Sequence, residues 1–113
     1  MRIAFIVDPL DTLKPAKDSS IAMMRAAQAA GHAVWTIQAP QLFWDALHGV
    51  CAEAVHLELL PDDGDWYAEL VRHTVPLREF AAVVMRKDPP FDLEYVTATW
   101  LLDRAEAEGA RAF

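Results

Sequence analysis

Three short polar segments contain residue types that bind small charged molecules. Asp8 follows an apolar run, the segment Asp18-Ser19-Ser20 opens a helical pattern, and the pair Arg86 and Lys87 follows another apolar run. Hydroxyls and free N–H groups at a helix start attract anions, an arginine grips a carboxylate through two N–H groups, and a lysine adds a point charge. Together these residues predict a binding site for a small ligand that carries carboxylates.

The individual roles differ, and each has a structural alternative. We expect Arg86 to contact a carboxylate, and Ser19 and Ser20 to offer hydroxyl and backbone donors. Asp8 and Asp18 either bind an amine of the ligand or only order their loops. Asp18 and Ser19 are also residues that favour helix N-caps, and Arg86 with Lys87 equally suits a solvated charge pair at a strand end.

Other chemistry has little support in the sequence. The four histidines lack metal-ligand spacing, Cys51 stands alone, and four glycines are too few for a glycine-rich phosphate loop. No catalytic residue and no metal ligand is therefore predicted. The four tryptophans are interpreted as core and interface side chains.

The first forty residues predict the elements that position two of the polar segments. Residues 3–7 and 33–37 are unbroken apolar runs typical of strands buried on both faces. Between them Asp18 caps a helix that ends at Gly31. A strand, a helix and a strand so closely spaced predict a parallel βαβ unit. The helix is expected to pack through a narrow stripe of Met23, Ala26, Ala27 and Ala30, with Arg25 and Gln28 pointing elsewhere.

The rest of the chain is less regular. Residues 41–60 predict a β-hairpin that turns at His48-Gly49, although its first arm also suits a helix, and residues 66–78 give no clear pattern. Residues 80–85 predict a third buried strand, Asp92 caps a helix over residues 93–108, and residues 110–113 begin a further strand. The predicted fold is a three-layer α/β domain with a mainly parallel sheet, a Rossmann-like arrangement in which the loops at the carboxyl ends of the strands line the ligand crevice.

Composition excludes several classes of protein. A formal net charge of -7 argues against binding to nucleic acid or to an anionic membrane surface. A hydrophobic content of 54% is ample for a core, but no run approaches the roughly 20 apolar residues of a membrane span. One cysteine allows no internal disulfide. We expect a cytoplasmic domain.

Three motifs, in the same order and spacing, resemble the bacterial glutathione synthetase family of ATP-grasp ligases. They are IVDP at residues 6–9, KDSS at residues 17–20, and MRKDPPFD at residues 85–92, which leads into EYVTATWLLDRAEAEG. Eight unbroken residues that include Pro-Pro are far more specific than a generic fingerprint. The resemblance extends over nearly the whole chain and is weakest over residues 41–78.

The resemblance implies a function for the whole enzyme and a part of it for this chain. The family joins γ-glutamylcysteine to glycine with ATP, giving glutathione, ADP and phosphate. Residues 1–113 then form its substrate-side, pre-ATP-grasp N-terminal domain, while ATP and Mg²⁺ bind to an ATP-grasp domain that this chain lacks. The chain alone is expected to be inactive, to bind neither cofactor, and to form a homo-oligomer. The alternative is a stand-alone, non-catalytic interaction or regulatory module with the same fold that dimerises through its hairpin and tryptophans.

Overall fold

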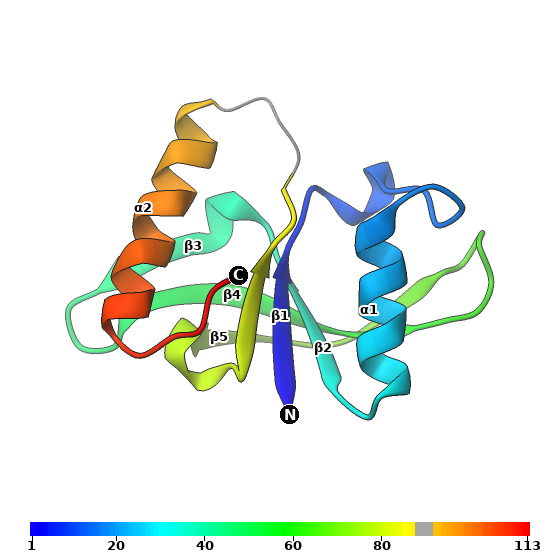
Figure 1. Cartoon of the computed structure of the whole chain (residues 1–113), viewed down its shortest axis with the longest axis horizontal. Coiled ribbons are helices and arrows are strands. Elements are labelled where there is room, and N and C mark those ends of the chain that lie inside the picture. Colours follow the sequence, from blue (N-terminus) through cyan, green and yellow to red (C-terminus); the bar gives the residue numbers. More distant parts are fainter. Residues whose placement is uncertain (88–91) are drawn as a thin grey trace.

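Strands and helices alternate along the chain, of which the computed structural model describes residues 1–87 and 92–113 (Figure 1). The strands are β1 (Arg2–Ile6), β2 (Ala33–Ile37), β3 (Leu42–Asp45), β4 (Gly49–Leu59), β5 (Tyr67–Pro76) and β6 (Ala82–Met85). The helices are α1 (Ser19–Ala29) and α2 (Leu93–Ala107), with short 3₁₀ turns η1 (Leu10–Thr12), η2 (Ala39–Gln41) and η3 (Leu77–Glu79).

The strands form one mixed sheet with a parallel and an antiparallel half. β1 lies between β2 and β6 and pairs in parallel with both. β4 pairs antiparallel with β2, β3 and β5, so the hairpin extends the same sheet. Ala112 forms a parallel bridge with Val83, which places the predicted start of a further strand beside β6.

Both faces of the central strand are buried. Ala4 and Ile6 of β1 pack in one hydrophobic cluster with Leu102 of α2. Phe5 and the adjoining Val7 pack in a second cluster with residues of α1. Alternate residues of a strand point to opposite faces, so the sheet is covered by α2 on one face and α1 on the other. The predicted three-layer α/β class is confirmed.

The helix α1 uses a different face from the predicted stripe. Met23 is exposed, as are Ala26 and Ala30, whereas the buried residues are Ser20, Ile21 and Met24. The prediction followed the smallest side chains, but the contact with the sheet is made by two bulky ones, Ile21 and Met24.

Arg25 and Gln28 also differ from the prediction, because both lie against the end of β4. The amide of Gln28 donates to the Leu59 carbonyl (2.9 Å) and accepts from the Leu59 N–H (2.7 Å). Arg25 donates to the Leu60 carbonyl (3.1 Å). The two side chains satisfy backbone groups where β4 ends, so α1 is fixed to the antiparallel half of the sheet.

The strand β5 was not predicted, and it makes the sheet more antiparallel than expected. It pairs along nearly all of β4, but most of its side chains are exposed on both faces. An edge strand without a buried face has no alternation for a sequence pattern to reveal. The predicted hairpin is confirmed as β3 and β4, and so are the helices capped by Asp18 and Asp92.

The hairpin turn is linked to the end of α2 through Gly49. This glycine has a φ of +77°, and a Cβ here would overlap the carboxylate of Glu108. That carboxylate accepts a hydrogen bond from the Val50 N–H (2.8 Å) and pairs with Arg104 (3.3 Å). A side chain at position 49 therefore displaces Glu108 as well as straining the backbone.

We predict that Gly49→Ala lowers the free energy of unfolding more than Gly31→Ala. Gly31 also has a positive φ, +93°, but an added Cβ would meet nothing within 4 Å. The left-handed backbone costs about 1–2 kcal/mol at both positions. Displacing Glu108 adds about 1–2 kcal/mol at Gly49 only.

Urea unfolding of both variants, repeated in a Glu108→Ala background, measures this difference. Without the Glu108 carboxylate the two glycine substitutions are expected to lower stability equally. A difference that persists in that background would show that Glu108 is not the cause.

Candidate functional site

The polar segments identified from the sequence meet at one edge of the sheet. Figure 1 shows that β1 and β6 end at the same edge and that α1 and α2 both begin there. Asp8 follows β1, the segment Asp18-Ser19-Ser20 opens α1, and Arg86 with Lys87 follows β6. Residues 88–91 of the motif MRKDPPFD lie outside the described part of the chain.

Arg86 lies against the start of α1. Its backbone N–H donates to the Ile6 carbonyl (2.8 Å), which continues the pairing of β6 with β1. The guanidinium donates from Nε to the hydroxyl of Ser20 (3.2 Å) and from a terminal nitrogen to the hydroxyl of Ser19. Two neutral hydroxyls thus orient the group and leave its charge in place.

Arg86 differs in this respect from most other arginines in the described part of the chain. Four of them pair with carboxylates, namely Arg2, Arg25, Arg72 and Arg104. No described carboxylate forms an ion pair with Arg86. A guanidinium has five N–H groups, and the serines accept from two of them. The half-buried guanidinium can therefore bind a carboxylate from outside.

The N-terminus of α1 is already capped. Asp18 precedes the helix in an extended conformation, and its carboxylate accepts a hydrogen bond from the Ser20 N–H (2.8 Å). This contact occupies the backbone donor of Ser20, and Ser20 is 5% exposed. The hydroxyls of Ser19 and Ser20 face Arg86, so in this structure both serines orient the arginine.

Lys87 joins three segments on the opposite side of the sheet from Arg86. Its ammonium group lies 3.4 Å from the Asp8 carboxylate and 3.5 Å from that of Glu94, in the first turn of α2. The Lys87 side chain is 11% exposed. Burial by itself would lower the pKa of Lys87, but the hydrogen bond and charge of Asp8, together with Glu94, outweigh it and raise that pKa.

Glu94 is the member of this ion-pair cluster that sequence reasoning missed. An acidic residue in the first turn of a helix is a recognisable signal, because it favours the positive end of the helix dipole. That signal predicts helix stabilisation and not a partner for Lys87. The cluster therefore neutralises Lys87 and Asp8 internally and ties β1, β6 and α2 together.

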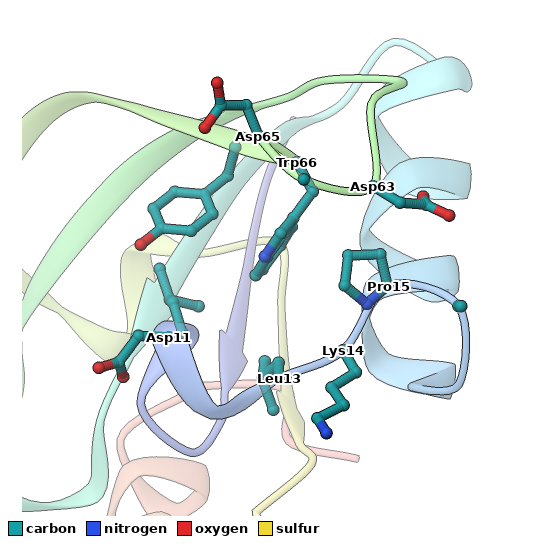
Figure 2. A pocket seen from close by; sticks show the side chains of 11 residues that line it. Asp11, Leu13, Lys14, Pro15, Asp63, Asp65 and Trp66 are labelled. Atoms are coloured by element: carbon teal, nitrogen blue, oxygen red, sulfur yellow. The ribbon is translucent and has the colours of Figure 1, made fainter.

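A surface pocket of about 680 Å³ lies beside α1, between the loop that follows β1 and the β4–β5 connection. Figure 2 shows the indole of Trp66 between Leu13 and Pro15, with Asp63 and Lys14 at the rim. Trp66 is 5% exposed, and Asp63 pairs with Arg25 (3.2 Å). Sequence reasoning did not predict this pocket, since its two walls are about fifty residues apart in the chain.

The remaining candidates for chemistry are of ordinary structural kinds. Within residues 1–87 and 92–113, no three His, Cys, Asp or Glu side chains gather as a metal site would require. Burial raises the pKa of the Cys51 thiol, with the nearby Asp45 charge adding to it, so this cysteine is unreactive. None of the described helices has the length and apolarity that crossing a membrane requires.

Comparison with known proteins identifies the family. Residues 1–113 match the family described as "Prokaryotic glutathione synthetase, N-terminal domain". The chain belongs to this family. It is 55% identical to the glutathione synthetase of Ralstonia nicotianae over its whole length, and 50% identical to that of Nitrosomonas europaea over 97% of its length. The glutathione synthetase of Bordetella pertussis is 45% identical over all of the chain.

Each of these matches concerns only part of the relative. The chain covers 35% of the Ralstonia and Nitrosomonas proteins and 37% of the Bordetella protein. It thus spans about a third of the length of the curated relatives it matches. The resemblance drawn from the three motifs is confirmed at the level of the glutathione synthetase N-terminal domain.

We predict that Lys87→Met lowers the free energy of unfolding by about 1–2 kcal/mol at neutral pH, because Asp8 and Glu94 lose their shared cation. Glu94 is 45% exposed, which keeps the loss below that of a fully buried pair. Since the pKa of Lys87 is raised by folding, its contribution is present below the ordinary lysine value of 10.5 and is lost as the pH rises through the folded value.

Urea unfolding from pH 7 to 11, with Lys17→Met as the control, tests this expectation. Lys17 is exposed and forms no ion pair with a described residue, so its loss is expected to change little. The difference between wild type and Lys87→Met should narrow only at the alkaline end. A difference already lost near neutral pH would contradict the assignment.

Proposed function

We propose that this domain supplies substrate-side contacts in a glutathione synthetase that joins γ-glutamylcysteine to glycine with hydrolysis of ATP. The family match and the relatives named glutathione synthetase support the activity. γ-Glutamylcysteine carries two free carboxylates, and a binding domain for it requires at least one cation that is not neutralised from within. Arg86 meets that requirement.

The orientation of Arg86 is the observation that carries this proposal. Ser19 and Ser20 fix the guanidinium through hydroxyl groups, and no described carboxylate pairs with it. A planar guanidinium held in one orientation pairs with a carboxylate through two parallel hydrogen bonds. We assign Arg86 to a substrate carboxylate and the two serines to its positioning.

The other residues predicted from the sequence receive supporting roles in this proposal. Asp18 caps α1 and holds the serines in place. Lys87 and Asp8 satisfy each other together with Glu94, so they order the loops around Arg86. We do not assign proton transfer or nucleophilic attack to any of them.

ATP and Mg²⁺ are proposed to bind outside this domain in the full-length enzyme. The described residues contain no group of three carboxylate, histidine or cysteine side chains suited to a metal ion. Phosphoryl transfer requires such ligands and dense positive charge around the transferred phosphate. The substrate-side role leaves that chemistry to the remaining two thirds of a synthetase chain.

We predict that Arg86→Ala in a full-length synthetase carrying this domain raises the KM for γ-glutamylcysteine by about ten- to a hundredfold, because a charged hydrogen-bonding partner is lost. The KM for ATP should stay nearly constant. Arg86→Lys keeps the charge but loses the fork and should fall between the two. Steady-state kinetics with each substrate varied in turn measures the effect.

Arg72→Ala is the matched control, since Arg72 is exposed on β5 and pairs with Glu69. This chain alone should give no turnover in the same assay. Unchanged kinetics for γ-glutamylcysteine in a folded Arg86→Ala enzyme would assign Arg86 to a structural role. It would favour the alternative of an interaction module in which this edge binds no substrate.

We further propose that the domain self-associates through a tryptophan surface formed by Trp44, Trp100 and Arg104. Trp44 of β3 is 52% exposed and Trp100 of α2 is 66% exposed. The Arg104 guanidinium lies 5.9 Å from the centre of the Trp44 ring, and Arg104 is one turn from Trp100 on the same helix face. Exposed apolar surface of this kind marks protein interfaces.

Sedimentation equilibrium over a hundredfold dilution is expected to show a dimer or larger assembly at micromolar concentration. The double variant Trp44→Ser, Trp100→Ser should be monomeric under the same conditions. Leu70→Ser, at an exposed site on β5, serves as the control. A monomeric wild-type chain at every concentration would refute self-association.

A further inference from the structure

A second pocket lies at the edge of the sheet opposite to Arg86. It has a volume of about 600 Å³, within the range of small-molecule sites, and His32, Arg78, Phe80, Gly109 and Arg111 contribute to its lining. These residues precede β2 and β6 or follow α2. The pocket therefore lies where the parallel strands begin, the lower edge in Figure 1.

The lining is positively charged in a chain whose net charge is -7. It contains Arg78 and Arg111, and none of its residues is Asp or Glu. Within the described residues neither arginine forms an ion pair, and Arg78 donates only to the His48 carbonyl. The neighbouring Glu79 is engaged with Arg2 (3.5 Å). The two guanidinium groups are therefore not neutralised by a carboxylate of the described chain.

His32 adds an unused polar group at the same place. Its Nδ1 is buried and has no hydrogen-bond partner among the described residues. A buried polar atom without a partner is unfavourable, and a protonated imidazole beside an anion would satisfy it. Both arginines are exposed, so a ligand can reach them from solvent.

The helix ends account for only part of this charge. Both α1 and α2 end at this edge, and a cation near a helix C-terminus offsets the helix dipole. His32 and Arg111 are suited to that role, one after each helix. Arg78 comes from η3 and follows neither helix. The last carbonyls of α2 already accept from the Gly109 and Ala110 N–H groups, which reduces the demand for a cation there.

We propose that this pocket binds a small anion with two or more negative charges, of the phosphate or polycarboxylate class. Arg78 and Arg111 bind its oxygens from two sides, and His32 adds a third donor when protonated. The site is separate from the Arg86 edge, because the two lie at opposite ends of the parallel strands. It does not depend on the function proposed for Arg86.

Titration of the ¹⁵N-labelled chain with pyrophosphate and with citrate, followed by NMR, tests the proposal and separates the two ligand chemistries. Saturable shifts are expected at the amides of Ala81, Ala82, Gly109 and Arg111. The chain has two hydrophobic clusters of its own, so it is suited to this measurement. Arg78→Ala and Arg111→Ala should each weaken binding by about tenfold, and Arg72→Ala should leave it unchanged.

Matched additions of sodium chloride control for ionic strength, which screens exposed charges without a specific site. Shifts that the chloride series reproduces would overturn the proposal. Saturable shifts confined to Ser19, Ser20 and Arg86 would overturn it as well, because they would place the anion at the opposite edge. Binding that survives both arginine substitutions would have the same meaning.

Discussion

The burial of β1 on both faces governs how the rest of the domain is arranged. Ala4 and Ile6 require a cover on one side, and Phe5 and Val7 require one on the other. Each helix follows a strand of the parallel half and runs back along it, so each must begin at the edge where those strands end. The two helix N-termini and the ends of β1 and β6 are therefore neighbours for reasons of core packing, and the polar residues after them meet as a consequence.

Strand alternation then separates two consecutive cations. Arg86 points to the side of α1, where it meets the hydroxyls of Ser19 and Ser20. Lys87 points to the side of α2, where the carboxylates of Asp8 and Glu94 surround it. One cation is thus kept charged and oriented toward an incoming ligand, while the other is neutralised as a structural link. This division explains how a strongly acidic chain retains a cation for an acidic substrate.

The acidic character of the chain also gives meaning to where its positive charge is not compensated. Arg2, Arg25, Arg72 and Arg104 are paired with carboxylates over the body of the domain. The arginines that lack such partners among the described residues lie at the two ends of the parallel strands. In a domain that covers about a third of its curated relatives, these two edges are the surfaces best suited to small anions, and the tryptophan surface is best suited to a protein partner.

The sequence by itself determined the features that depend on local hydrogen bonding and on burial of short runs. The three strands of the parallel half, the caps at Asp18 and Asp92 and the turn at Gly49 are all of this kind, and so are the motifs that identified the family. Only the tertiary structure decided the face that α1 buries, the existence of β5 and the role of Glu94. Each of these depends on a partner distant in the chain. Gln28 meets Leu59, β5 is held by β4 without a buried face of its own, and Glu94 is joined to Asp8 only through Lys87. Local patterns contain no record of such pairings, because their energy arises only when the chain has folded.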